Sequence, residues 1–87
     1  MAQQYHQNTQ QIKTRKAILI FLKHVGPPVV LYVDNTEETY EELKQLMEKS
    51  SPASPKLIEK QGKGPVKSLS LLDTQIAGIA IQEENFV

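Results

Sequence analysis

The chain has 87 residues, with ten basic side chains, ten acidic side chains and no cysteine. That length fits one small domain with a modest core, and the missing thiols exclude disulfides and thiolate chemistry. The balanced charge argues against a dedicated nucleic-acid binder, no apolar run approaches a membrane span, and the N-terminal residues carry no apolar secretion signal. We therefore expect a cytoplasmic protein with no membrane segment.

Residues 1–15 form a polar segment rich in glutamine. They hold few apolar side chains, so burial cannot offset the entropy that ordering them would remove. We expect a flexible tail over these residues, a single domain over residues 16–84 and a frayed end over residues 85–87. The alternative for the tail is an arm that folds on a partner, with basic residues at its base.

Two apolar segments follow, over residues 16–23 and 29–33. Both are too short for typical helices and are rich in isoleucine, valine or phenylalanine, so they predict strands. Gly26, Pro27 and Pro28 predict the turn between them. Neither segment alternates apolar with polar residues, so both faces of these strands should be covered.

A helix is predicted over residues 36–49, because apolar residues such as Leu43 and Met47 recur at helical spacing. Asp34 and Glu37 have the spacing of a capping box at its start, with aspartate in the place of serine or threonine. Prolines in the following loop cannot continue the helix and are expected to end it.

Three further strands are predicted over residues 56–60, 66–72 and 76–82. The last is again apolar on both sides, and Gly78 within it allows a neighbour to approach closely. The order is therefore ββαβββ. It predicts an α+β fold, in which one helix packs on one face of a mainly antiparallel sheet that is open or curled into a partial barrel.

One helix can cover one face of a five-stranded sheet, and nothing in the chain is expected to cover the other. An uncovered apolar face on a small chain is typical of an interface. We therefore expect a homo-oligomer, with a dimer favoured, or contact with an unidentified protein partner. The predicted self-association surface consists of these strand residues: Ile18, Ile20, Leu22, Val30, Tyr32, Ile79 and Ile81.

Several short features of the sequence occur together in one known family: Leu22-Lys23, Pro28-Val29, Tyr40 with Met47, Ser54-Pro55-Lys56-Leu57, and the hairpin over residues 70–81. In these features, residues 18–84 resemble a small uncharacterised protein family of cyanobacteria and algal chloroplasts. The chain departs from that family in its glutamine-rich tail and in having no cysteine near the third strand. The resemblance implies the same architecture and a cytosolic or stromal setting, and it implies no activity or site.

Some residue types in the chain can support chemistry, but each group has a simpler interpretation. A phosphate loop needs a longer spacing than Gly62-Lys63-Gly64 and a helix after it, so a hairpin loop is favoured. His6 and His24 have no nearby nucleophile or set of metal ligands. Four carboxylates on the helix are typical of a solvated face rather than a calcium loop: Glu37, Glu38, Glu41 and Glu42. We predict no catalytic, cofactor or metal site.

Basic residues form a second candidate surface, in the tail and over residues 56–67. They predict an alternative function, in which an accessory protein binds nucleic acid through its phosphates. Stacking on bases would need exposed aromatic side chains, and only Phe21 and Tyr32 lie on the predicted strands. The leading hypothesis is therefore a non-enzymatic interaction or self-association module, and an enzyme with a site between subunits is a third. The predicted basic contact patch consists of Lys13, Arg15, Lys16, Lys56, Lys60, Lys63 and Lys67.

Overall fold

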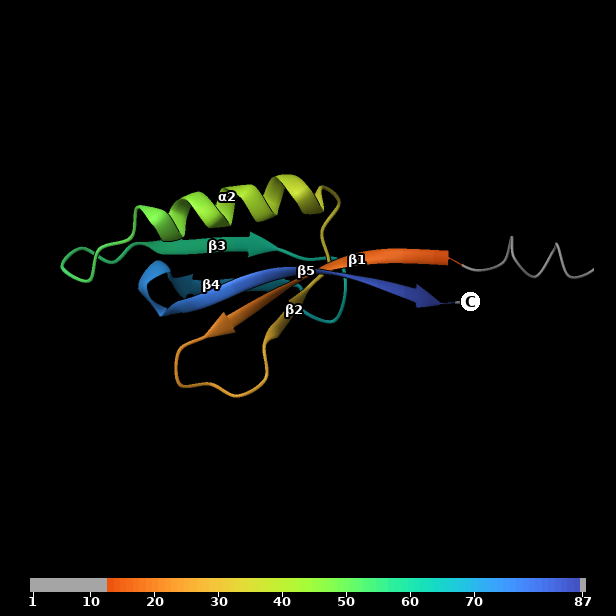
Figure 1. Ribbon diagram of the computed structural model, residues 1–87, viewed down its shortest axis with the longest axis horizontal. Coiled ribbons are helices and arrows are strands. Elements are labelled where there is room, and N and C mark those ends of the chain that lie inside the picture. The colour runs from red at the N-terminus through yellow and green to blue at the C-terminus, as the bar shows by residue number, and fades with distance from the viewer. Residues whose placement is uncertain (1–12, 87) are drawn as a thin grey trace, which may run out of the picture.

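The computed structural model describes residues 13–86 of the chain (Figure 1). These residues form a three-stranded antiparallel sheet, a two-stranded antiparallel sheet and one α-helix. The predicted α+β class and the predicted order of elements are confirmed. Within the described residues the strands do not close into a barrel.

The larger sheet has the strand order β2-β1-β5. Its central strand, β1 (Lys13–Leu22), pairs along its whole length with β5 (Ile76–Phe86). The short edge strand β2 (Val29–Leu31) pairs only with residues 18–20 of β1. Beyond β2, the first and last strands continue together as a two-stranded ribbon, which extends to the right in Figure 1.

The remaining strands, β3 (Leu57–Gln61) and β4 (Ser68–Leu72), form a separate hairpin rather than extending the larger sheet. The alternation of their residues gives the physical reason. Ile58 is buried and Leu71, its partner on β4, packs against the core, while their neighbours on the other side of the hairpin are exposed. A hairpin with one apolar side serves as a covering layer, whereas β1 is apolar on both sides and suits a sheet centre.

The helix α2 (Thr36–Glu48) lies beside this hairpin, on the same side of the larger sheet. Its N-cap residue is Asn35, which makes no side-chain cap hydrogen bond, so the predicted capping box is wrong. Glu37 instead pairs with Lys16 of β1, and Asp34 pairs with Lys63 in the loop after β3. The start of the helix is therefore held by ion pairs to two other elements.

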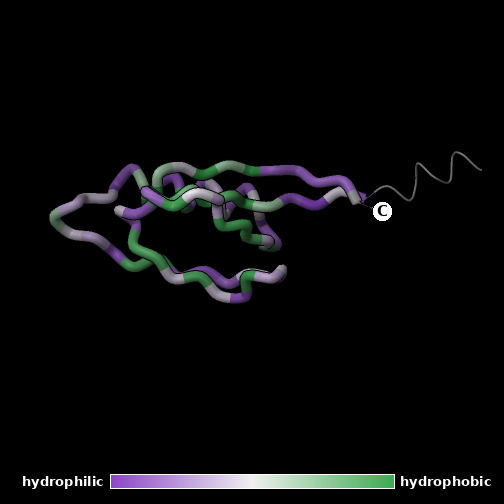
Figure 2. The backbone as a smooth tube through the Cα atoms, turned by 90° about the horizontal axis from the view of Figure 1, so that it is seen from below, coloured by the Kyte–Doolittle hydropathy of each residue, from purple (hydrophilic) through white to green (hydrophobic). Residues whose placement is uncertain are grey.

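The core lies between the larger sheet and the layer formed by α2 and the hairpin. Its buried apolar side chains come from all of these elements: Ile18, Ile20, Leu31, Leu43, Ile58 and Ile76. Figure 2 shows hydrophobic segments where the layers overlap and hydrophilic segments along the far end of the β1–β5 ribbon. Burial in this fold is therefore concentrated at one end of the long strands.

Both predicted ends of the domain fall inside the ribbon. Strand β1 begins at Lys13, so residues 13–15 belong to the strand rather than to the predicted tail, and β5 continues through residues 85 and 86. Pairing with the opposite strand supplies the backbone hydrogen bonds that residues 13–15, 85 and 86 need. Residues 1–12 of the predicted tail, and residue 87, lie outside the described residues.

Candidate functional site

The larger sheet has two faces, which are set by the alternation of side chains along its strands. On β1, Ile18 and Ile20 are fully buried and point to the core, together with Leu22. The residues between them, Leu19 and Phe21, therefore point to the opposite face. We call that opposite side the open face, because α2 and the strands of the hairpin pack on the other side.

Most residues of the predicted self-association surface lie on the covered face of the sheet rather than on the open face. Ile18 and Ile20 have no exposed surface, and Leu22 and Ile79 pack against the core. Ile81 is the register partner of Ile18 and so lies on the same side. The only members of the predicted surface that remain on the open face are Val30 and Tyr32.

The open face contains apolar residues that the prediction did not include. Leu19 lies between its partners Val30 on β2 and Ala80 on β5, and neither Leu19 nor Val30 is fully buried. In the next row, Phe21 is opposite Gly78 and is 38% exposed. Apolar side chains that remain accessible on one side of a sheet are what a binding surface requires.

A signal for this face was present in the fifth strand. Its large residues Ile79 and Ile81 alternate with the small residues Gly78 and Ala80. Large side chains fill a core more effectively than small ones, so this alternation indicates which side of the strand faces inward. The contiguous apolar run in β1 contains no comparable alternation.

A polar cluster borders the open face at the ribbon. The Arg15 Nε atom donates to Glu84 Oε1 at 3.1 Å, and the Tyr32 hydroxyl donates to the same oxygen at 3.1 Å. The Arg15 guanidinium also lies 4.3 Å from the centroid of the Tyr32 ring, within range of a cation–π interaction. A further hydrogen bond of 2.7 Å comes from Gln82 Nε2 to Glu84 Oε2. The cluster fixes Tyr32 at one end of the face.

The pKa values in this cluster shift in the directions that these contacts require. The hydrogen bond from Arg15 holds the pKa of the Glu84 carboxyl below its ordinary value, because it favours the charged form. Desolvation raises the pKa of the Tyr32 phenol, and its hydrogen bond to Glu84 adds to the effect. Glu84 is therefore charged and Tyr32 neutral near pH 7.

The Gly62-Lys63-Gly64 loop supports Tyr32 from the hairpin. The Lys63 amide donates to the Tyr32 carbonyl at 2.8 Å, and the Gly62 amide donates to the Lys67 carbonyl at 2.9 Å. A Cβ atom placed on Gly64 would lie 2.3 Å from Tyr32 Cδ2, so only glycine allows the loop to approach the ring. Two of the loop amides that a phosphate would need are thus engaged in the fold.

The predicted basic contact patch is divided by ion pairs. Within the described residues, four of its members pair with carboxylates: Arg15 with Glu84, Lys16 with Glu37, Lys60 with Glu42, and Lys63 with Asp34. Two of these carboxylates, Glu37 and Glu42, belong to the acidic group on the helix. These four members of the patch therefore lie next to carboxylates and do not form a surface of positive charge alone.

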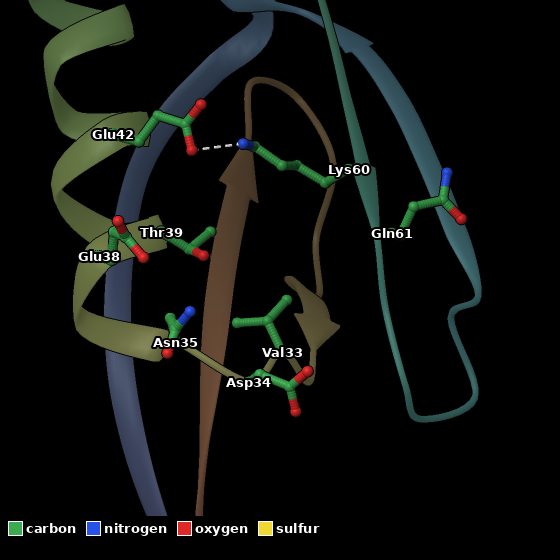
Figure 3. A pocket seen from close by; sticks show the side chains of 8 residues that line it. All are labelled: Val33, Asp34, Asn35, Glu38, Thr39, Glu42, Lys60 and Gln61. Carbon is green, nitrogen blue, oxygen red and sulfur yellow. Dashed lines mark hydrogen bonds and ion pairs between the residues drawn. The ribbon is translucent and has the colours of Figure 1, made fainter.

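A groove of about 510 Å³ lies between α2 and β3 (Figure 3). Glu42 and Lys60 point toward each other across it and form an ion pair, and Val33 contributes an apolar side chain to its lining. Residues 13–86 contain no group of three or more histidine, cysteine or carboxylate residues placed to hold a metal ion. The groove has polar contacts to offer, but it contains no paired nucleophile and base.

His24 does not line this groove. His24 is exposed in the turn between β1 and β2, where its φ of 63° lies in the left-handed region. Histidine is one of the residues that adopt this conformation more readily than most. The other histidine, His6, lies outside the described residues.

The comparisons with known proteins found no relative of this chain. No family model, no curated protein and no solved structure matches the chain. The resemblance to the family of cyanobacteria and algal chloroplasts therefore stays a prediction. In the part of the chain that the structure describes, no helix has the length and apolar character needed to cross a bilayer.

Proposed function

We propose that this chain is a non-enzymatic self-association module, and that its open face packs against a second copy. The observation that carries the proposal is the exposed apolar side of the larger sheet, centred on Leu19 and Phe21. The layer formed by α2 and the hairpin lies on the other face, so a partner is needed to remove the open face from water. Burying a large apolar side chain contributes roughly 1.5–3 kcal/mol relative to leaving it exposed.

Self-association is preferred over nucleic-acid binding for an electrostatic reason. Binding to phosphates requires a surface with a positive excess. Here Lys60 and Lys63 each have a carboxylate partner, as do Arg15 and Lys16 in the ribbon. A band-shift assay with single-stranded RNA at low salt tests the alternative, and salt-sensitive binding there would favour it over self-association.

Light scattering of the purified protein over a range of micromolar concentrations tests the proposal. We expect a mass that rises toward twice the monomer mass as concentration increases. The variant Phe21→Asp places a charge on the open face and should raise the dissociation constant at least about tenfold, because that charge would be desolvated in the interface.

The matched control is Leu72→Asp. Leu72 is 41% exposed on the outer side of the hairpin, close to the 38% of Phe21, so both variants add one charge at a similarly accessible apolar position. The control should associate as the unaltered chain does. A monomeric mass for the unaltered protein at all concentrations, or equal effects of the two substitutions, would contradict the proposal.

A further inference from the structure

On the open face, each residue of β1 and its register partner on β5 form a row across the two strands. In the two central rows the paired residues differ in size. Phe21 lies opposite Gly78, and Leu19 lies opposite Ala80. In both rows the larger side chain is on β1 and the smaller residue is on β5. Nothing lies within 4 Å of a Cβ atom built on Gly78, so the space above this glycine is open, and we call it the hollow.

At the ribbon end of the same face, the two residues of one row carry opposite charges. Arg15 on β1 is the register partner of Glu84 on β5, and the two side chains form an ion pair. Their side chains are 53% and 22% exposed, so both remain accessible to a partner. In the two apolar rows the larger residue is therefore on β1, and at the ribbon end the positive charge is on β1. In the row between them the larger residue, Gln82, is on β5 opposite Ala17.

Building on the proposed self-association, we infer that two copies pack face to face about a two-fold axis that runs parallel to the strands, between β1 and β5. This rotation places β1 of each copy over β5 of the other and keeps every row in register. Phe21 then fills the hollow above Gly78 of the second copy, and Arg15 lies over Glu84 of the second copy. Each contact occurs twice, as it must in an isologous interface.

This arrangement matches the way sheets pack in β-sandwiches. Two packed sheets lie about 10 Å apart, with strands aligned to within about 30°. A large side chain opposite a small one lets the two layers interdigitate at that spacing. Leu19 over Ala80 of the second copy repeats the fit of Phe21 over Gly78. The open faces of the two copies would then form one shared core.

A two-fold axis that runs across the strands gives a poorer fit. That rotation reverses the second copy, so β1 packs over β1 with the residue order inverted. Arg15 would then approach Lys23 of the second copy, while the small residues of β5 would face one another. Like charges in contact and unfilled space both weaken an interface. The charge pattern therefore selects the axis parallel to the strands.

Single cysteine variants distinguish the two axes, because the chain has no cysteine of its own. Lys13 begins β1 and Lys23 directly follows its last residue, so the two lie roughly 30 Å apart at about 3.3 Å per residue. With the proposed axis, equal ends of the two copies lie together. Lys13→Cys should therefore cross-link to itself through a flexible bis-maleimide, and so should Lys23→Cys. Lys44→Cys, on the exposed side of α2, is the control for random collisions.

A mixture of the two end variants, one of them labelled with ¹⁵N, gives the decisive comparison by intact mass. The proposed axis predicts products that join two heavy chains or two light chains. Products that join one heavy and one light chain would show the reversed orientation and overturn the inference. That result would leave self-association itself intact, whereas a monomer in light scattering would remove the proposed function as well.

Charge exchange tests whether β1 of one copy lies over β5 of the other. Arg15→Glu and Glu84→Arg should each weaken association, because each creates like charges across the interface. An equimolar mixture restores both intersubunit pairs, and we expect it to associate about fivefold more tightly than either variant alone. Circular dichroism of each variant checks that the fold is kept. A mixture no tighter than its components would contradict the inference.

Discussion

The two faces of the larger sheet are built from alternate residues of the same strands, yet they have opposite environments. On one face, Ile18 and Ile20 are fully buried under α2 and the hairpin. On the other face, Leu19 is partly exposed and Phe21 is 38% exposed. The side chains on the two sides of β1 are similar in size and polarity. The difference shows that the covering layers, rather than the hydrophobicity of the strand, determine which face becomes the core.

The two faces should also affect different measurable quantities, the stability of one chain and the association of two. Contacts on the covered face form when one chain folds, so substitutions there should change the free energy of unfolding. The apolar side chains of Leu19 and Phe21 on the open face gain further contacts only when a second copy binds, so substitutions at these two positions should change the dissociation constant and leave the monomer fold intact. Substitutions at neighbouring positions of one strand can therefore test the two roles independently.

The largest expected effect separates adjacent positions on β1. Ile20→Ala removes a fully buried side chain from the core and should lower the free energy of unfolding by about 2–5 kcal/mol. Leu19→Ala, one residue away on the open face, should lower it by less than about 1 kcal/mol when measured in dilute, monomeric protein. Urea denaturation measures both, and equal losses would contradict the assignment of the two faces.

A second contrast compares two glycines. A Cβ on Gly64 would lie 2.3 Å from Tyr32, so Gly64→Ala should destabilise the fold by about 1–3 kcal/mol through overpacking. Gly78→Ala meets open space and should change stability by less than about 0.5 kcal/mol. Thermal unfolding of both variants provides the comparison.

A double-mutant cycle identifies the cause of the Gly64 effect. In a Tyr32→Ala background the ring is absent, so Gly64→Ala should have little further effect on stability. An undiminished loss in that background would show that the backbone of the loop, and not the Tyr32 ring, requires glycine.

A third contrast tests whether the hollow at Gly78 is needed for association but not for folding. Gly78→Leu has room on the open face of a single chain, so the unfolding free energy should stay within about 0.5 kcal/mol. The added side chain would occupy the space proposed for Phe21 of the second copy, and the dissociation constant should rise at least about tenfold. Analytical ultracentrifugation measures this effect, and Gly78→Ala is the smaller control. Association unchanged by leucine would contradict the contact between Phe21 and the hollow above Gly78 of the second copy.

The smallest expected effect concerns the polar end of the open face. The pKa of Glu84 is lower in the folded chain than its ordinary value of 4.5, chiefly because of the hydrogen bond from Arg15. This carboxylate therefore stabilises the fold above pH 4.5, and the contribution is lost as the pH falls through the folded pKa. Glu84→Gln should make the unfolding free energy less dependent on pH below that value. Arg15→Gln should produce the same change, and an unaltered pH dependence in both would refute the link.

Local patterns predicted the elements of the fold and their order. The spacing of Leu43 and Met47 indicated the helix, which the structure places at Thr36–Glu48, and glycine and proline marked the turns. The excess of apolar surface over what one helix can cover was also visible in the sequence. These features depend on residues close together in the chain, so they can be recognised without knowing the tertiary contacts.

Two features could not be predicted from local patterns, because they depend on contacts between distant residues. These are the side of β1 that is buried and the separation of the β3–β4 hairpin from the larger sheet. A run such as residues 17–22 is apolar on both sides, so the side chains that α2 and the hairpin pack against it, such as Leu43 and Ile58, decide which side is buried. The predicted capping box failed for the same reason, because Lys16 competes for Glu37 from a strand about twenty positions earlier. Register partners across the chain cannot be read from a single local pattern.

The pairing of the first strand with the last also has a consequence for synthesis on the ribosome. Lys13 is the register partner of Phe86, and the contacts between β1 and β5 span most of the described chain. The edge of β1 that pairs with β5 therefore stays unpaired until nearly all of these residues have been translated. The hairpin of β3 and β4 can form earlier, because its strands are close in sequence. Completion of the larger sheet is a late, long-range closure step, and chaperones would meet the nascent chain while β1 is still exposed.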